Sequence, residues 1–173
     1  MRPQKGFSLI ELLIVVAIIL IIAAIAVPNL LRSRMAANES SAAVSMRTIS
    51  TANITYSSVY GIGYAQTFSF LGPDSSNPGV TSSAFADLID STLRTGLKSG
   101  YDFNTYDVVD ANTDGIFDTY TEVAVPILAQ QTGNSTFCVD QSNIILKDPS
   151  GVNTVAGSPG GGCPAAGFTV LGN

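Results

Sequence analysis

The sequence predicts an α+β fold in which one long N-terminal helix packs on a small antiparallel β-sheet. Two observations carry this prediction. The chain opens with an apolar run and continues with helical periodicity to about residue 61. Its second half holds short segments rich in β-branched and aromatic residues, separated by Gly, Asn or Asp, which is typical of strands in a meander. At 173 residues the chain has room for one domain and an N-terminal extension.

Charge is divided unevenly along the chain. Residues 1–35 contain four basic residues and one acid, whereas residues 36–173 contain four basic residues and twelve acids, a formal net charge of −8. Nucleic-acid surfaces need clustered Lys and Arg, so no direct nucleic-acid site is expected. With no histidine and two cysteines, Ser/His/Asp and Cys/His nucleophile pairs and the usual zinc sites are excluded as well.

The apolar run covers residues 7–27, and Ser8 and Glu11 are its polar members. As a helix it is about 30 Å long, which matches the hydrocarbon core of a bilayer. Three interpretations compete: a signal peptide, a permanent anchor, and a segment that is stored in the membrane and later forms the core of an assembly. The run is too long for a signal peptide, and a plain anchor has no reason to carry a carboxylate that costs about 2–3 kcal/mol at mid-bilayer. Glu11 therefore favours the third interpretation.

The string KGFSLIELLIVVAIILIIAAIAVPNL closely resembles the N-terminal signature of type IV pilins and of the pseudopilins of type II secretion systems. In that family a membrane peptidase cuts after a glycine, the new N-terminal phenylalanine is N-methylated, and a glutamate lies four residues further on. Gly6, Phe7 and Glu11 occupy those places, and Pro28 matches a proline that often ends the apolar run. The resemblance is dense over about residues 5–35.

Together with the periodicity, the resemblance implies an organisation in four parts. These are a leader peptide (1–6), a transmembrane and filament-core helix (7–28), an amphipathic stem helix (29–61) and a globular α+β head (62–173). The resemblance also implies a structural subunit that is not an enzyme and requires no cofactor. Its expected partners are identical copies of itself, a prepilin peptidase, and pilus or type II secretion assembly machinery. Its expected location is the bacterial inner membrane as a single-pass subunit, then an extracellular or periplasmic filament.

Pro28 interrupts the predicted helix. It lacks an N–H and its ring crowds the carbonyl of Ala24, so a kink or partial melting of the helix is predicted there. The resemblance implies that residues 20–28 are unwound in the filament.

The stem beyond Pro28 has one apolar helical face, which we expect to lie on the head, and a polar face opposite. The apolar face consists of Met35, Ala42, Met46, Ile49, Tyr56 and Val59, and the polar face of Arg34, Ser41, Ser45, Thr48 and Thr55. The helix is expected to end by Gly61.

The head begins with a predicted loop over residues 64–80, which contains LGPDSSNPG. The next segment, TSSAFADLIDSTLRTG, has apolar residues at helical spacing and predicts a short helix with Ser82 or Ser83 as its N-cap and Gly96 at its end. Four strands are then predicted, in YDFNTYDVV, FDTYTEVAVPIL, STFCVDQ and NIILKD.

Between the first two predicted strands, DANTDGIFD has the ligand spacing of a calcium loop. Its candidate ligands, at positions 1, 3, 5, 7 and 9, are Asp110, Asn112, Asp114, the carbonyl of Ile116, and Asp118. Position 12, where an EF-hand has glutamate, is Thr121, and Glu122 comes one residue late. The alternative is a polar hairpin turn built on Asp114 and Gly115, and calcium remains the one ligand that the sequence suggests.

Cys138 and Cys163 are the only cysteines, and the second lies in the glycine-rich AGSPGGGCP. A disulfide between them closes about 25 residues and stabilises the fold by about 3–4 kcal/mol on the loop-entropy model. It requires an oxidising compartment, which agrees with export. The resemblance implies a C-terminal disulfide-bounded loop as well.

Three other interpretations stay open at the level of the sequence. A type II secretion pseudopilin shares the N-terminus, but usually has a shorter head with a C-terminal calcium site and no disulfide. A secreted calcium-binding or adhesive domain on an uncleaved anchor keeps residues 1–6. A membrane-anchored hydrolase needs two head acids that face one another in a cleft.

Overall fold

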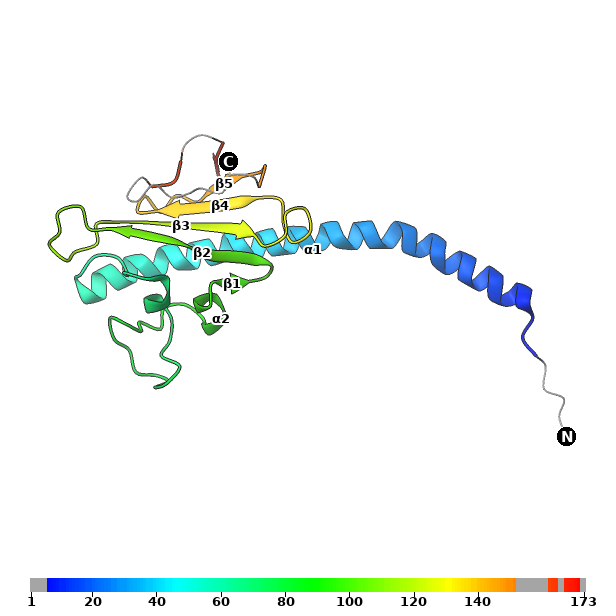
Figure 1. Cartoon of the computed structure of the whole chain (residues 1–173), viewed down its shortest axis with the longest axis horizontal. Coiled ribbons are helices and arrows are strands. Elements are labelled where there is room, and N and C mark those ends of the chain that lie inside the picture. The colour runs from blue at the N-terminus through cyan, green and yellow to red at the C-terminus, as the bar shows by residue number, and fades with distance from the viewer. Residues whose placement is uncertain (1–5, 152–161, 165–166, 172–173) are drawn as a thin grey trace. The chain divides into compact units, whose positions relative to one another are not determined.

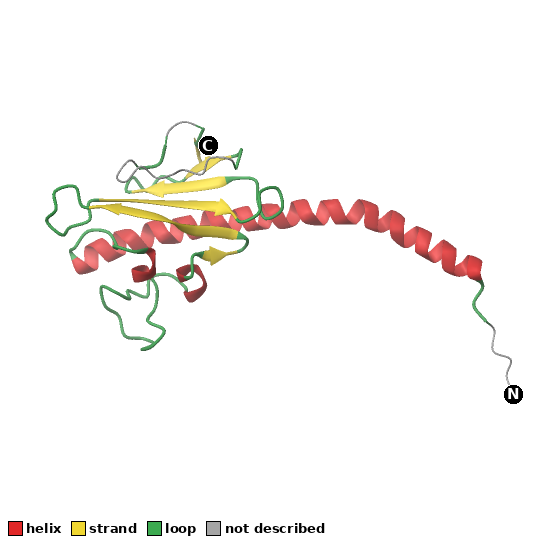
Figure 2. Ribbon diagram, viewed as in Figure 1, coloured by secondary structure: helices red, strands yellow, loops and turns green. Residues whose placement is uncertain are grey.

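The computed structural model describes residues 6–151, 162–164 and 167–171, without the side chains of residues 104 and 105. It divides into two compact units, one up to Arg34 and one from Met35 onward. The first unit is helical, and the second combines the rest of the same helix with an antiparallel sheet (Figure 2). The predicted α+β class is confirmed.

Helix α1, Leu9–Tyr60, continues through Pro28 without leaving the α conformation. Of the two predicted outcomes, partial melting at this proline is therefore wrong for the isolated subunit, and a kink stays a prediction. A proline removes one backbone hydrogen bond, while the aliphatic turns on both sides retain theirs. Unwinding of residues 20–28 inside a filament stays a prediction.

The stem part of α1 buries a broader face than the apolar stripe. Its buried residues are Ala42, Ser45, Met46, Ile49, Ser50, Ala52, Asn53 and Tyr56. Ser45 was expected on the polar face but is buried, and Val59 was expected on the buried face but is 66% exposed. The sheet and the irregular segments beside it cover α1 over more than one helical ridge, so small polar residues beside the stripe are enclosed too. The predicted end is confirmed, because α1 stops at Tyr60 and Gly61 has a φ of 68°.

The segment predicted as a linking loop contributes to the core. Its short 3-10 helix η1, Phe68–Leu71, buries both of its terminal side chains. The tight turn brings these residues under the sheet, which composition alone does not reveal.

The helix predicted over residues 81–96 is mostly wrong. Only Ser91–Arg94 is helical (α2), and its N-cap is Asp90, whose carboxylate accepts a hydrogen bond from the N–H of Leu93 at 2.9 Å. Neither Ser82 nor Ser83 caps it. Gly96, with a φ of 77°, follows its end as predicted.

Tertiary hydrogen bonds explain why residues 86–89 are not helical. The N–H of Ala86 donates to the carbonyl of Phe70, and the N–H of Ile89 donates to that of Leu71. These bonds to η1 replace intrahelical ones while Ala86 and Ile89 stay buried. Residues 86–89 therefore bury apolar side chains as the pattern predicted, but as an irregular segment and not as a helix.

The sheet is a six-stranded antiparallel meander in the order β1-β2-β3-β4-β5-β6 (Figure 1). Its strands are β1 Leu97–Lys98, β2 Tyr101–Val109, β3 Thr119–Pro126, β4 Thr136–Asp140, β5 Leu146–Asp148 and β6 Thr169–Val170. The four predicted strands are confirmed, and the two-residue strands β1 and β6 extend the sheet at its edges. An irregularity between Asp102 and Thr105 shifts the β2–β3 register, so that Tyr101, Phe103 and Tyr106 all reach the core cluster.

The main core lies between α1 and one face of the sheet. Its largest fully buried side chains include Tyr56, Tyr101, Tyr120 and Phe137. A smaller cluster, Val123, Cys138 and Phe168, packs separately. The strand alternation of β3 places neighbouring residues on opposite faces, so one strand serves both clusters.

Candidate functional site

The N-terminal part of α1 is apolar and uncovered. Phe7 is 83% exposed, and the large aliphatic residues between Leu9 and Val27 are 46–80% exposed. By length and composition α1 can cross a membrane, and the most apolar window, with a mean hydropathy of 3.3, is nowhere buried in the structure. An apolar surface of this extent needs lipid or other protein to cover it.

Glu11 caps the start of α1. The backbone N–H of Ser8, the residue before the helix, donates to Oε2 of Glu11 at 3.0 Å. Serine at the N-cap and glutamate three residues later form the capping-box pattern, in which the glutamate reaches back to the N-cap N–H. This contact was not predicted from the sequence, although the spacing in SLIE was the signal for it. In the uncleaved chain, the described hydrogen-bond partner of Glu11 is thus the backbone N–H of Ser8.

Gly6 and Phe7 precede the helix in irregular backbone, and both are exposed. No heavy atom lies within 4 Å of the place where a Cβ on Gly6 would be. Both residues that flank the predicted cleavage point are therefore exposed in the described structure. Cleavage there stays a prediction.

The disulfide between Cys138 and Cys163 is present, with 5.8 Å between the Cα atoms. Cys138 lies in the middle of β4 and is fully buried. The N–H of Cys163 donates to Oδ2 of Asp140 at 2.9 Å, which ties the returning chain to the end of the same strand. Most of the glycine-rich loop, residues 152–161, lies outside the described residues.

The DANTDGIFD hairpin, residues 110–118, is completed by its own hydrogen bonds. Asp110 accepts from the backbone N–H groups of Asp114 (3.2 Å) and Gly115 (2.8 Å). The carboxylate of Asp114 accepts from the N–H of Ile116, and that of Asp118 from the N–H of Ala111.

Asn112 points its amide nitrogen, not its oxygen, at Asp114. In the part of the chain that the structure describes, no group of three His, Cys, Asp or Glu side chains is placed to hold a metal ion. The bonds fit the polar-turn alternative, and calcium stays a prediction.

A polar cluster that was not predicted from the sequence joins the stem to the sheet. Oε1 of Glu39 accepts from the N–H of Asn134 (2.8 Å), and Oε2 accepts from the hydroxyl of Ser135 (3.1 Å) and from Nζ of Lys147 (3.3 Å). Burial acts to raise the pKa of Glu39, but these three donors outweigh it and hold the pKa below its usual value. The signal was available, since Glu39 lies four residues after Met35, on the apolar face of the stem.

Glu122 is the other buried acid. It lies in β3 opposite Tyr106, is fully buried, and neither carboxylate oxygen has a hydrogen-bond partner among the described residues. Desolvation, with a smaller contribution from Asp102, raises its pKa well above the usual value. Enclosed between sheet and helix, it cannot meet a substrate, so it does not supply the cleft-facing pair that a hydrolase needs.

Comparison with known proteins confirms the resemblance at the N-terminus. Residues 1–27 match the family model described as the prokaryotic N-terminal methylation motif. The type IV wide pilus major component PilA4 of Thermus thermophilus is 64% identical over 39 residues, which cover 22% of this chain and 30% of that protein. No solved structure matches the chain. The family model thus covers the segment that holds Gly6, Phe7 and Glu11. The similarity to the curated relative extends over less than a third of that protein's length.

Proposed function

We propose that this chain is a structural subunit of a type IV pilus-like filament. In this proposal a prepilin peptidase cleaves it after Gly6, it waits in the inner membrane of a bacterium, and it polymerises with further copies through α1. It is a pilin and not an enzyme, and it needs no cofactor.

One observation carries the proposal: an uncovered apolar helix start that matches the methylation motif and contains a carboxylate. Lipid can cover the exposed aliphatic side chains of residues 9–27 before assembly, and the same segments of other subunits can cover them afterwards. Lipid alone gives Glu11 no partner beyond its own helix start.

Cleavage changes the chemistry around Glu11. It turns the backbone nitrogen of Phe7 into an α-amino cation four residues before Glu11 in the sequence, a spacing that places both groups on one helical face if α1 extends to its new N-terminus. N-methylation keeps that positive charge. In an apolar environment each charge needs a partner, and the amine of a neighbouring subunit can supply one for Glu11. Removing one partner of a buried pair costs about 3–5 kcal/mol, so the carboxylate favours the register in which the pair forms.

The experiment compares Glu11→Leu and Glu11→Gln in cells that lack the wild-type subunit. Glutamine keeps an oxygen that can accept the hydrogen bond from Ser8 but carries no charge. Both variants are expected to insert into the membrane and to be processed to Phe7, yet to be strongly depleted in sheared filaments relative to the membrane pool. Wild-type incorporation of Glu11→Gln but not of Glu11→Leu means that capping, not charge pairing, is what assembly requires. Wild-type incorporation of both removes Glu11 from the account of assembly.

A pilus is favoured over a type II secretion pseudopilus by two observations. The relative is described as a pilus component, and the head has the disulfide that major pseudopilins usually lack. Electron microscopy of surface filaments sheared from cells, with identification of their peptides, tests this. A mature protein that retains residues 1–6 contradicts the proposal and favours a head on an uncleaved anchor.

A further inference from the structure

The stem carries an apolar groove on the solvent side of α1, within the second unit. The groove has a volume of about 330 Å³ and is lined by Val44, Arg47, Thr48, Thr51, Thr55 and Leu88, among others. Val44 is 57% exposed.

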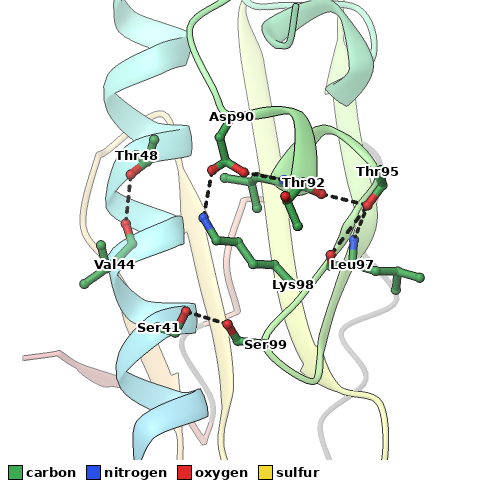
Figure 3. Close-up of polar contacts among 10 residues, drawn as sticks. Ser41, Val44, Thr48, Asp90, Thr92, Thr95, Leu97, Lys98 and Ser99 are labelled. Carbon is green, nitrogen blue, oxygen red and sulfur yellow. Dashed lines mark hydrogen bonds and ion pairs between the residues drawn. The ribbon is translucent and has the colours of Figure 1, made fainter. Parts of the chain in front are cut away.

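The hydroxyl groups of the threonines in this groove are already hydrogen-bonded, so a partner would meet these side chains mainly through their methyl groups. The hydroxyl of Thr48 donates to the carbonyl of Val44 at 3.1 Å, as Figure 3 shows. Those of Thr51 and Thr55 donate one turn back in the same way, at 3.0 and 2.9 Å. Because each hydroxyl is already bonded to the helix, an apolar partner can cover the groove without stranding a donor.

Arg47 is the one basic side chain of residues 36–173 for which the described structure records no ion pair, side-chain hydrogen bond or ring contact. Lys98 and Lys147 form ion pairs. Arg94 donates to Ser75 and lies over the ring of Phe85. The groove thus combines an apolar floor with a free guanidinium, on a head whose formal net charge is −8.

The hairpin 110–118 has the complementary pattern. Ile116 is an exposed aliphatic side chain, 42% exposed, between the exposed Asp114 and Asp118. Both carboxylates are bonded to N–H groups of the hairpin, which holds them in place, but neither forms an ion pair with a described cation.

Arg47 and the base of the hairpin are too far apart to pair within one subunit. The hairpin is attached just beyond the C-terminal end of α1, where the N–H of Phe117 donates to the carbonyl of Ile62. Arg47 lies 13 residues before Tyr60, which is about 20 Å along the helix. A second copy displaced by about that distance along α1 brings its hairpin beside the groove.

We propose that the hairpin 110–118 of one subunit docks into the α1 groove of the next, with Ile116 on the apolar floor and Asp114 or Asp118 paired with Arg47. The inference rests on the proposed filament function and names the contact between heads. Because the hairpin and the groove are different surfaces, each subunit can bind one neighbour through its hairpin and another through its groove. A contact of this kind propagates as an open assembly instead of closing as a dimer.

Cysteine crosslinking tests this contact in the full chain, in cells lacking the wild-type subunit. Thr48→Cys combined with Ile116→Cys is expected to give a ladder of covalent multimers in sheared filaments, while each single variant gives none. Thr48→Cys with Val80→Cys is the matched control, because Val80 is exposed in another loop. Filaments in normal amount without the ladder, or with covalent dimers alone, overturn the inference and leave the filament proposal standing. Absence of filaments from the wild-type chain overturns the filament proposal itself.

Charge exchange gives an independent readout. Arg47→Asp places like charges in contact, so we expect about tenfold less subunit in filaments. Adding Asp118→Arg to Arg47→Asp is expected to restore most of the loss. Normal filament yield from Arg47→Asp contradicts the proposed pairing.

Discussion

The buried carboxyl of Glu122 makes the stability of the head depend on pH in a direction opposite to that of most acids. Its side chain is fully buried against Tyr106, without a hydrogen-bond partner among the described residues, and its folded pKa lies well above 4.5. At pH values between the unfolded and the folded pKa, the folded state holds a proton that the unfolded state has released. The contribution of Glu122 to the free energy of unfolding is therefore fully present below about pH 4.5. It falls as pH rises toward the folded pKa, by about 1.4 kcal/mol per pH unit at most.

Glu122→Gln isolates this effect because glutamine does not titrate. Between pH 5 and pH 7 the stability of the variant relative to the wild type is expected to rise by up to about 3 kcal/mol. Glu122→Leu goes further, because it also removes an unpartnered polar group, which costs about 1–3 kcal/mol when buried. For a chain of this size, each kcal/mol corresponds to about 2–4 °C in Tm.

The assay is urea unfolding of the detergent-solubilised chain at pH 5, 6 and 7, followed by the near-ultraviolet circular dichroism of the tyrosines. Tyr106 and Tyr120 lie in the same core cluster and report on its packing. The difference between Glu122→Gln and the wild type must grow with pH. A difference that is the same at all three values refutes a proton-bearing Glu122, whatever the absolute stabilities are.

Four further predictions concern other residues. Gly6→Val should leave the unprocessed form in the membrane, as mass spectrometry of the N-terminus can show, and normal processing contradicts the assigned cleavage point. Glu39→Gln should destabilise the head by about 2 kcal/mol at pH 7, since hydrogen bonds to a charged group are lost. Because the folded pKa of Glu39 is lowered, that contribution exists above its unfolded pKa of about 4.5 and disappears as pH falls through the folded value, so wild type and variant should converge in acid. Cys138→Ser should lower the free energy of unfolding by about 3–4 kcal/mol, and equal urea midpoints with and without reduction of the wild type count against this. Millimolar calcium should raise Tm in the wild type and not in Asp110→Ala, whereas an unchanged wild-type Tm leaves residues 110–118 as a polar turn.

Local patterns in the sequence sufficed for much of this protein. The run at residues 7–27 identified the membrane-compatible helix, because its length and hydropathy do not depend on the rest of the chain. Segments rich in β-branched and aromatic residues, separated by Gly, Asn or Asp, located the four main strands. The disulfide was predicted because two cysteines allow one pairing. The capping contact of Glu11 was equally local, since Ser8 lies three residues away, and its pattern could have been recognised.

Tertiary structure decided the features that depend on contacts far apart in the sequence. Residues 86–89 left the helical state because carbonyls of η1 were in reach, and Ser45 became buried because the covered face of α1 is wider than its apolar stripe. Glu39 found its partners about a hundred residues away, at Asn134 and Lys147. Glu122 lost its contact with water because the register of β3 turns it toward α1. Periodicity shows which face of a helix or strand is apolar. The polar residues that are buried along with that face depend on the register and extent of the elements that cover it.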